Sequence, residues 1–197
     1  MRTTLAAAVA LSTGILFAPT AYGQANDEKL GKVNFETSCK PEAQKLFNQG
    51  MLYQHSFWYR ASQQTFEDVL KADPENQEAL ITLLLALTDR FEKGYGVSDT
   101  QAKELLSRIK SEYERNYYAG IFNERRAKAK LRQGTPDCRF QAYDLFLEAM
   151  NWFEKAEAIR PPGHDDALLR WNTCARIIAR NNLVPREEEE RIEFPLE

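Results

Sequence analysis

The residues best suited to do chemistry are three cysteines and two histidines, spread over the length of the chain. Cys39, Cys138 and Cys174 form no CxxC or CxxCH pattern, and no HExxH sequence or glycine-rich phosphate loop is present. His55 and His164 each lie beside an expected turn and make no pair with metal-ligand spacing. The spacing therefore predicts neither a metal centre nor catalysis by a Cys–His pair, and we expect no cofactor.

Cys39 is the cysteine whose position best supports a reactive thiol. It lies near the start of an expected helix, where the helix dipole can lower the pKa of a thiol. Cys174 lies on an apolar helix face and is interpreted as a small buried hydrophobic residue. Antiparallel helices ending at residue 160 and starting at 164 would hold Cys138 and Cys174 roughly 16 Å apart, too far for a disulfide. Pairing of Cys39 with either of them stays open.

The charge balance is mildly acidic, with 26 Lys and Arg against 29 Asp and Glu and a formal net charge of -3 over 197 residues. It gives no electrostatic reason to expect a nucleic-acid partner. The most basic run is ERRAKAKLR at 124–132. Its cations are expected to spread around a helix, so we interpret the run as a solvated face. An anion site, a membrane-surface site and a contact with the acidic tail Glu187–Glu190 are the alternatives.

Residues 1–23 have the pattern of a signal peptide. Arg2 precedes an apolar run from Leu5 to Phe17, and Ala21-Tyr22-Gly23 gives a small-x-small cleavage site before Gln24. The apolar run is short for a bilayer span, and no later segment is long and apolar enough. We expect export, to the bacterial periplasm, with no transmembrane segment in the mature chain. An uncleaved N-terminal anchor is the alternative.

Residues 43–74 predict two helices folded back on each other. Each helix has one face with residues at i, i+4 and i+7, and Asp73-Pro74 ends the second helix. These faces consist of Leu46, Gly50 and Tyr53 in the first helix and Ser62, Phe66 and Val69 in the second. Gly50 and Ser62 are small and lie at about equal distances from the turn, so the two backbones can approach closely.

This stretch resembles a tetratricopeptide repeat of exported bacterial proteins, which has a period of 34 residues. With Pro74 at position 32, Gly50 falls at position 8, Tyr53 at 11, Ser62 at 20 and Phe66 at 24. Position 4 (Leu46) and position 7 (Gln49) depart from the family pattern. A second signature matches positions 20, 24, 27 and 32 with Ala149, Phe153, Ala156 and Pro161, and Gly120 lies at the height of Ala149.

Further helices are expected over 75–91, 99–110, 112–132 and 139–159 and from 165 to about 180, and a continuous rod over 99–132 is an alternative. The predicted fold class is all-α: about three stacked antiparallel hairpins with a terminal capping helix, like an array of tetratricopeptide repeats. The expected organisation is a signal peptide at 1–23, a polar leader at 24–40, the helical domain at 41–180 and an acidic tail at 181–197.

The resemblance implies that the inner face of the first helices, at repeat positions 2, 5, 9 and 12, binds another protein. Carried over, these positions are Gln44, Phe47, Met51, Gln54, Glu78, Ile81, Leu85, Thr88, Glu114, Tyr117, Ile121 and Glu124. The expected partner-binding groove is their apolar subset, namely Phe47, Met51, Ile81, Leu85, Tyr117 and Ile121. The Lys and Asn side chains that clamp a chain end in some members are absent, which favours a helix or an extended apolar segment as the ligand.

Three alternatives to this function stay open. The groove residues can instead be core, because a short, tightly wound array buries its own inner face. The chain can instead be a thiol-active or small-ligand-binding periplasmic protein that uses Cys39. It can also self-associate through the groove.

Overall fold

The computed structural model describes residues 30–91 and 99–186. The predicted signal peptide, residues 24–29 of the leader and residues 187–197 of the acidic tail lie outside the described residues. The described chain contains helices and no strands, which confirms the all-α prediction. The helices are α1 (Pro41–His55), α2 (Tyr59–Ala72), α3 (Gln77–Thr88), α4 (Asp99–Arg108), α5 (Glu112–Gln133), α6 (Pro136–Ala158) and α7 (Asp166–Arg180).

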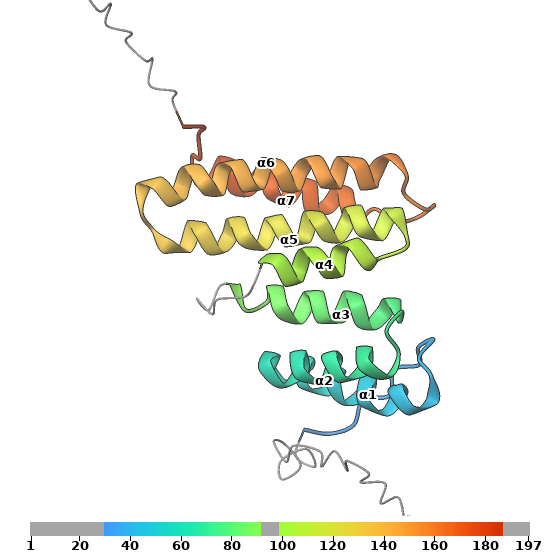
Figure 1. The fold of residues 1–197 in the computed structure, drawn as a ribbon. Coiled ribbons are helices and arrows are strands. Elements are labelled where there is room, and N and C mark those ends of the chain that lie inside the picture. The colour runs from blue at the N-terminus through green and yellow to red at the C-terminus, as the bar shows by residue number, and fades with distance from the viewer. Residues whose placement is uncertain (1–29, 92–98, 187–197) are drawn as a thin grey trace, which may run out of the picture.

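The helices stack in chain order, each packed against the next (Figure 1). Helices α1 and α2, α3 and α4, and α5 and α6 form three antiparallel hairpins, and α7 packs along α6. The predicted stack of hairpins with a terminal helix is therefore the observed architecture. Helix α3 has helices on two sides, which explains why Leu80, Leu83, Leu84 and Leu87 are all buried.

Two glycines allow the hairpins to close tightly. A Cβ atom added at Gly50 would lie 2.8 Å from the Phe66 ring, and one added at Gly120 would lie 2.4 Å from the Phe153 ring. Each glycine therefore lets a phenylalanine of the second helix rest on the backbone of the first. The predicted close approach is present, with the ring four residues after Ser62 or Ala149 filling the space at the glycine.

The core has two parts. The first part is formed by α1 to α4 and the first half of α5, and it contains Phe47 and Phe66. The second part is formed by α5, α6 and α7, and it contains Phe153 and Cys174. Helix α5 contributes to both parts and joins them into one stack.

Local signals explain the helix ends. Asn76 caps α3 by accepting a hydrogen bond from the Ala79 N–H (2.8 Å), and Ser111 caps α5 in the same way. The cap at Ser111 separates α4 from α5, so the continuous rod considered over 99–132 is not formed. Gly134 ends α5 in the left-handed conformation, and Pro136 starts α6 three residues earlier than predicted. Asp165 precedes α7 without a capping hydrogen bond from its side chain.

Candidate functional site

The predicted apolar groove is partly closed. The side chain of Phe47 is 1% exposed and that of Ile121 is 3% exposed, so both belong to the core. The Phe47 ring lies 5.3 Å from the Phe66 ring and 6.2 Å from the Phe35 ring, centroid to centroid. The other four groove residues are half-buried against the core, namely Met51, Ile81, Leu85 and Tyr117. Phe47 and Ile121 are thus removed from the set of residues that a partner can contact.

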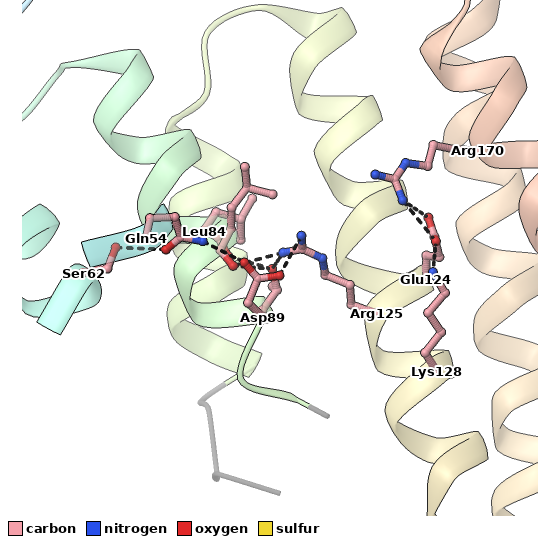
Figure 2. A network of polar contacts seen from close by, with 10 residues as sticks. Gln54, Ser62, Leu84, Asp89, Glu124, Arg125, Lys128 and Arg170 are labelled. Atoms are coloured by element: carbon pink, nitrogen blue, oxygen red, sulfur yellow. Dashed lines mark hydrogen bonds and ion pairs between the residues drawn. The ribbon is translucent and has the colours of Figure 1, made fainter. Parts of the chain in front are cut away.

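Polar side chains gather at the other end of the same inner face. Gln54, Thr88 and Glu124 are the residues that the resemblance assigns to repeat position 12. The Gln54 side chain donates a hydrogen bond to the Asp89 carboxylate (2.8 Å) and accepts one from the Ser62 hydroxyl (2.9 Å). The hydroxyl of Thr88 accepts a hydrogen bond from Arg125. The structure therefore links the ends of α1 and α3 to α5 through a polar network (Figure 2).

Arg125 is the centre of this network. Its guanidinium pairs with the Asp89 carboxylate at 2.8 Å and donates to the Leu85 carbonyl at 3.0 Å as well as to Thr88. Burial lowers the pKa of Arg125, the Asp89 carboxylate raises it, and the nearby Arg170 guanidinium lowers it. Arg125 is therefore held in place by α3 and lies in the field of a second cation.

Glu124 organises the opposite side of α5. Its side chain is 1% exposed, and its carboxylate accepts hydrogen bonds from Lys128 and from Arg170 of α7 (3.3 Å). Burial lowers the pKa of Arg170, but Glu124 and the neighbouring Tyr117 raise it, and the net change is upward. Figure 2 shows the division: Arg125 points toward the end of α3, whereas Glu124 points toward α7.

A pocket of about 430 Å³ opens at this place, and we call it the cationic pocket. Its walls come from the α1–α2 turn, the end of α3, the second half of α5 and α7. The lining residues are Phe57, Tyr59, Thr88, Asp89, Arg125, Lys128, Arg132 and Arg170. Four of these side chains are cationic and one is a carboxylate. The volume is in the range of pockets that hold a small ligand or one or two side chains.

The interpretation of the run 124–132 as a solvated face did not predict this pocket. Arg125, Lys128 and Arg132 are spaced i, i+3 and i+7, so they share one face of α5 and line one pocket. Arg126 points elsewhere, pairing with Asp99 at 2.9 Å. The helical spacing of these three cations was the available signal.

An exposed aromatic ring stands at the rim of the cationic pocket. Phe57 has a φ of 61° and a side chain that is 72% exposed. The Trp58 N–H bonds to the Tyr53 carbonyl and the Phe57 N–H to the Gln54 carbonyl, which is the Schellman pattern that places a left-handed residue after a helix. Glycine or asparagine usually occupies that position, and a bulky side chain there is an outlier.

The neighbouring rings fix this turn. Trp58 stacks on Tyr53 with ring centroids 5.9 Å apart, which supplies the apolar contact that accompanies a Schellman motif. Tyr59 lies edge-on to Phe57 with centroids 6.2 Å apart. The helix end is thus stabilised by residues other than Phe57, whose own ring is left at the pocket rim.

The cysteines are free thiols, and no disulfide joins them. Cys39 is half-buried, and burial raises its pKa; a hydrogen bond with Thr37 lowers the pKa, the carboxylates of Asp73 and Glu78 raise it, and the net change is upward. Burial raises the pKa of Cys174 to about 12. The expected lowering of the Cys39 pKa by a helix dipole is therefore contradicted.

The two histidines have different surroundings in the structure. His164 packs its ring against Tyr113, and His55 is exposed at the end of α1. In the part of the chain that the structure describes, no group of three or more His, Cys, Asp or Glu side chains is arranged to hold a metal ion. Over the same residues, no helix has the length and apolar character needed to cross a bilayer.

Comparison with protein families and with curated proteins identifies no relative of this chain. A scan against models of protein families finds no match, and a search of curated proteins finds no significant match. The resemblance to tetratricopeptide repeats therefore stays a prediction from the sequence, and the site has to be interpreted from its own geometry.

Proposed function

We propose that this chain is an exported helical scaffold of the tetratricopeptide type that holds another protein against the inner face of its hairpins. The observation that carries the proposal is the cationic pocket, whose walls come from four separate parts of the stack. A stack of hairpins brings such distant segments together into one surface, which is how helical repeats bind their ligands. Two of the half-buried groove residues contact the pocket wall: the Leu85 carbonyl accepts a hydrogen bond from Arg125, and Tyr117 interacts with Arg170.

The chemistry of the pocket favours binding over catalysis. Its lining has no cysteine or histidine, and the three thiols of the chain lie elsewhere. Arg125 is held by Leu85 and Thr88 of α3 and by Asp89 directly after it, so its guanidinium has a fixed position in the pocket wall. A preorganised wall lowers the entropic cost of association. The raised pKa of Cys39 argues against the thiol-active alternative.

The experiment that tests this proposal is site-specific photocrosslinking in cells that naturally contain the protein. Tyr59, which lines the pocket, is replaced by the photoreactive residue benzoylphenylalanine in the full chain. The matched control carries the same residue at Leu169, which is 60% exposed on α7 and outside the pocket. Both variants are first shown by circular dichroism to be helical.

We expect the Tyr59 position to give one discrete crosslinked protein that the Leu169 position does not give. Addition of the charge-reversing substitution Arg132→Glu to the Tyr59 variant is expected to weaken that crosslink. Equal products from the two positions, or no product from the Tyr59 position, would contradict a partner-binding function for this face.

A further inference from the structure

The chain just before α1 folds back over the face of α1 that carries Phe47. Residues 34–37, which we call the strap, run along α1 in the opposite direction. This direction follows from two contacts: the Phe35 N–H donates to Asn48, whereas the Thr37 N–H donates to Gln44, one turn nearer the start of α1. The sequence indicated no more than a polar leader here.

The strap is held through its main chain. The side-chain amide of Gln44 donates to the Phe35 carbonyl (2.7 Å) and accepts from the Thr37 N–H (3.2 Å). The side-chain carbonyl of Asn48 accepts from the Phe35 N–H (3.0 Å). In an extended chain, the N–H and C=O groups of alternate residues lie along one edge. Two amide side chains of α1 therefore bind one edge of the strap, much as a neighbouring strand would.

The strap also closes the apolar groove that the sequence predicted. The Phe35 ring lies 6.2 Å from the Phe47 ring, centroid to centroid. Phe47 is 1% exposed, whereas 49% of Phe35 is exposed, so Phe35 covers a core ring and gains little burial itself. Met51, one turn further along α1, stays half-buried. The groove is thus closed at Phe47 by a segment that is itself largely at the surface.

The base and the tip of this segment are held differently. At the base, the Ser38 hydroxyl donates to the Glu78 carboxylate (2.8 Å), and the Lys40 N–H donates to Asp73 (3.2 Å). At the tip, residues 34–36 are exposed. A segment with solvent-exposed hydrogen bonds and few buried apolar contacts opens at low free-energy cost. The anchored base keeps an opened strap close to α1, so it can rebind readily.

We propose that the strap occupies, in the free protein, a binding site for an extended segment of the partner protein, and that the partner's segment binds by displacing it. This inference rests on the proposed scaffold function and names the kind of ligand. The segment that fits places an aromatic side chain over Phe47 and main-chain groups against Gln44 and Asn48. Main-chain hydrogen bonds give such a site affinity, and the aromatic side chain gives it selectivity.

The contacts of the strap distinguish between the two ligands that the sequence left open, a helix and an extended segment. Gln44 and Asn48 bond to backbone N–H and C=O groups. In a helix these groups are already bonded to each other, so a helix could not use the two amides in this way. The site therefore favours an extended segment.

The test uses fluorescence anisotropy with the full mature chain and a labelled peptide that copies residues 30–38 of this chain. Phe35→Ala in the protein weakens the strap and leaves the α1 face intact. Gln44→Ala, added to Phe35→Ala, removes the amide that binds the peptide main chain, and Asn48→Ala replaces it if that double variant does not fold. Phe57→Gly is the matched control, because it removes an exposed ring away from the strap at a φ that glycine tolerates. Every variant is first shown to unfold cooperatively in urea.

We expect the strap of the parent chain to compete with the peptide, so that the apparent affinity falls with the fraction of open chains. Phe35→Ala should bind the peptide about tenfold more tightly than the parent, because the half-exposed ring supplies part of the free energy of closing. Phe57→Gly should bind within about twofold of the parent, and adding Gln44→Ala should cost Phe35→Ala about tenfold. A peptide with glycine in place of its phenylalanine should lose the gain.

The partner is tested in the crosslinking experiment. Phe35→Ala, added to the variant with benzoylphenylalanine at Tyr59, should raise the yield of the crosslinked protein, because the site is then open more often. Addition of Gln44→Ala should lower that yield again.

Three results would overturn the inference: equal peptide binding by the parent and Phe35→Ala, equal binding with and without Gln44→Ala, or a dimeric parent that Phe35→Ala dissociates. The third would indicate that the strap of one copy occupies the site of a second copy. If the Tyr59 crosslink is present and Phe35→Ala leaves its yield unchanged, this inference alone falls. If the crosslink is absent, the scaffold function falls, and the inference falls with it.

Discussion

The substitution Gly120→Ala tests whether the close packing of α5 against α6 specifies the hairpin. An alanine Cβ at this position would lie 2.4, 2.6 and 2.8 Å from three atoms of the Phe153 ring. That ring is fully buried in the second part of the core and is packed against Tyr117 with centroids 6.0 Å apart. It cannot swing into solvent to make room.

The expected magnitude comes from two opposing effects. Overpacking a filled core costs about 1–3 kcal/mol, and a contact as short as 2.4 Å places this case at the upper end. Replacing glycine by alanine inside a helix returns about 1 kcal/mol through helix propensity. We therefore expect a net loss of about 2 kcal/mol in the free energy of unfolding. Gly50→Ala should lose less, because its shortest contact is 2.8 Å.

Urea unfolding followed by circular dichroism measures this change as a lower midpoint at unchanged slope. The double variant Gly120→Ala, Phe153→Leu should be more stable than the sum of the two single changes predicts, because the smaller side chain makes room for the new methyl group. A Gly120→Ala variant as stable as the parent, or more stable, would refute the close-packing argument.

Two further predictions concern buried ionisable groups. Glu124→Gln should destabilise the fold by roughly 1–3 kcal/mol, less than for a fully buried pair because Lys128 and Arg170 are 30% and 40% exposed. Urea unfolding measures this loss, and a Glu124→Gln variant as stable as the parent would contradict the role of Glu124 in joining α5 to α7. Burial raises the pKa of Cys174 from 9.0 to about 12, so its contribution to stability is complete below pH 9 and is lost as the pH rises toward 12. Unfolding midpoints measured across this range should fall less for Cys174→Ala than for the parent, and rapid alkylation of native Cys174 at neutral pH would contradict the buried thiol.

The sequence determined the local structure of this protein. Apolar residues at helical spacing, the Asp73-Pro74 stop and the glycine at 134 defined the helices to within a few residues. The small residues at Gly50 and Gly120 indicated where hairpins close, because an absent Cβ leaves room that a neighbouring helix fills. These signals act over a few residues, so a single sequence contains them in full.

Only the tertiary structure decided which inner-face residues remain available. Phe47 and Met51 have the same apolar character and lie on the same helix, yet Phe47 is covered by Phe35 and Phe66, whereas Met51 stays half-buried. Which of them is covered depends on how a distant segment of chain lies across the helix. Helical periodicity carries no information about that placement.

The cationic pocket has the same origin. The spacing of Arg125, Lys128 and Arg132 could have indicated one face of a helix, but nothing in it indicated Asp89 or Arg170 as neighbours. The contact from Arg170 to Glu124 joins residues 46 positions apart, and it exists because α7 packs beside the α5–α6 hairpin. Electrostatic interaction depends on distance in space, and the stacking of the hairpins sets that distance.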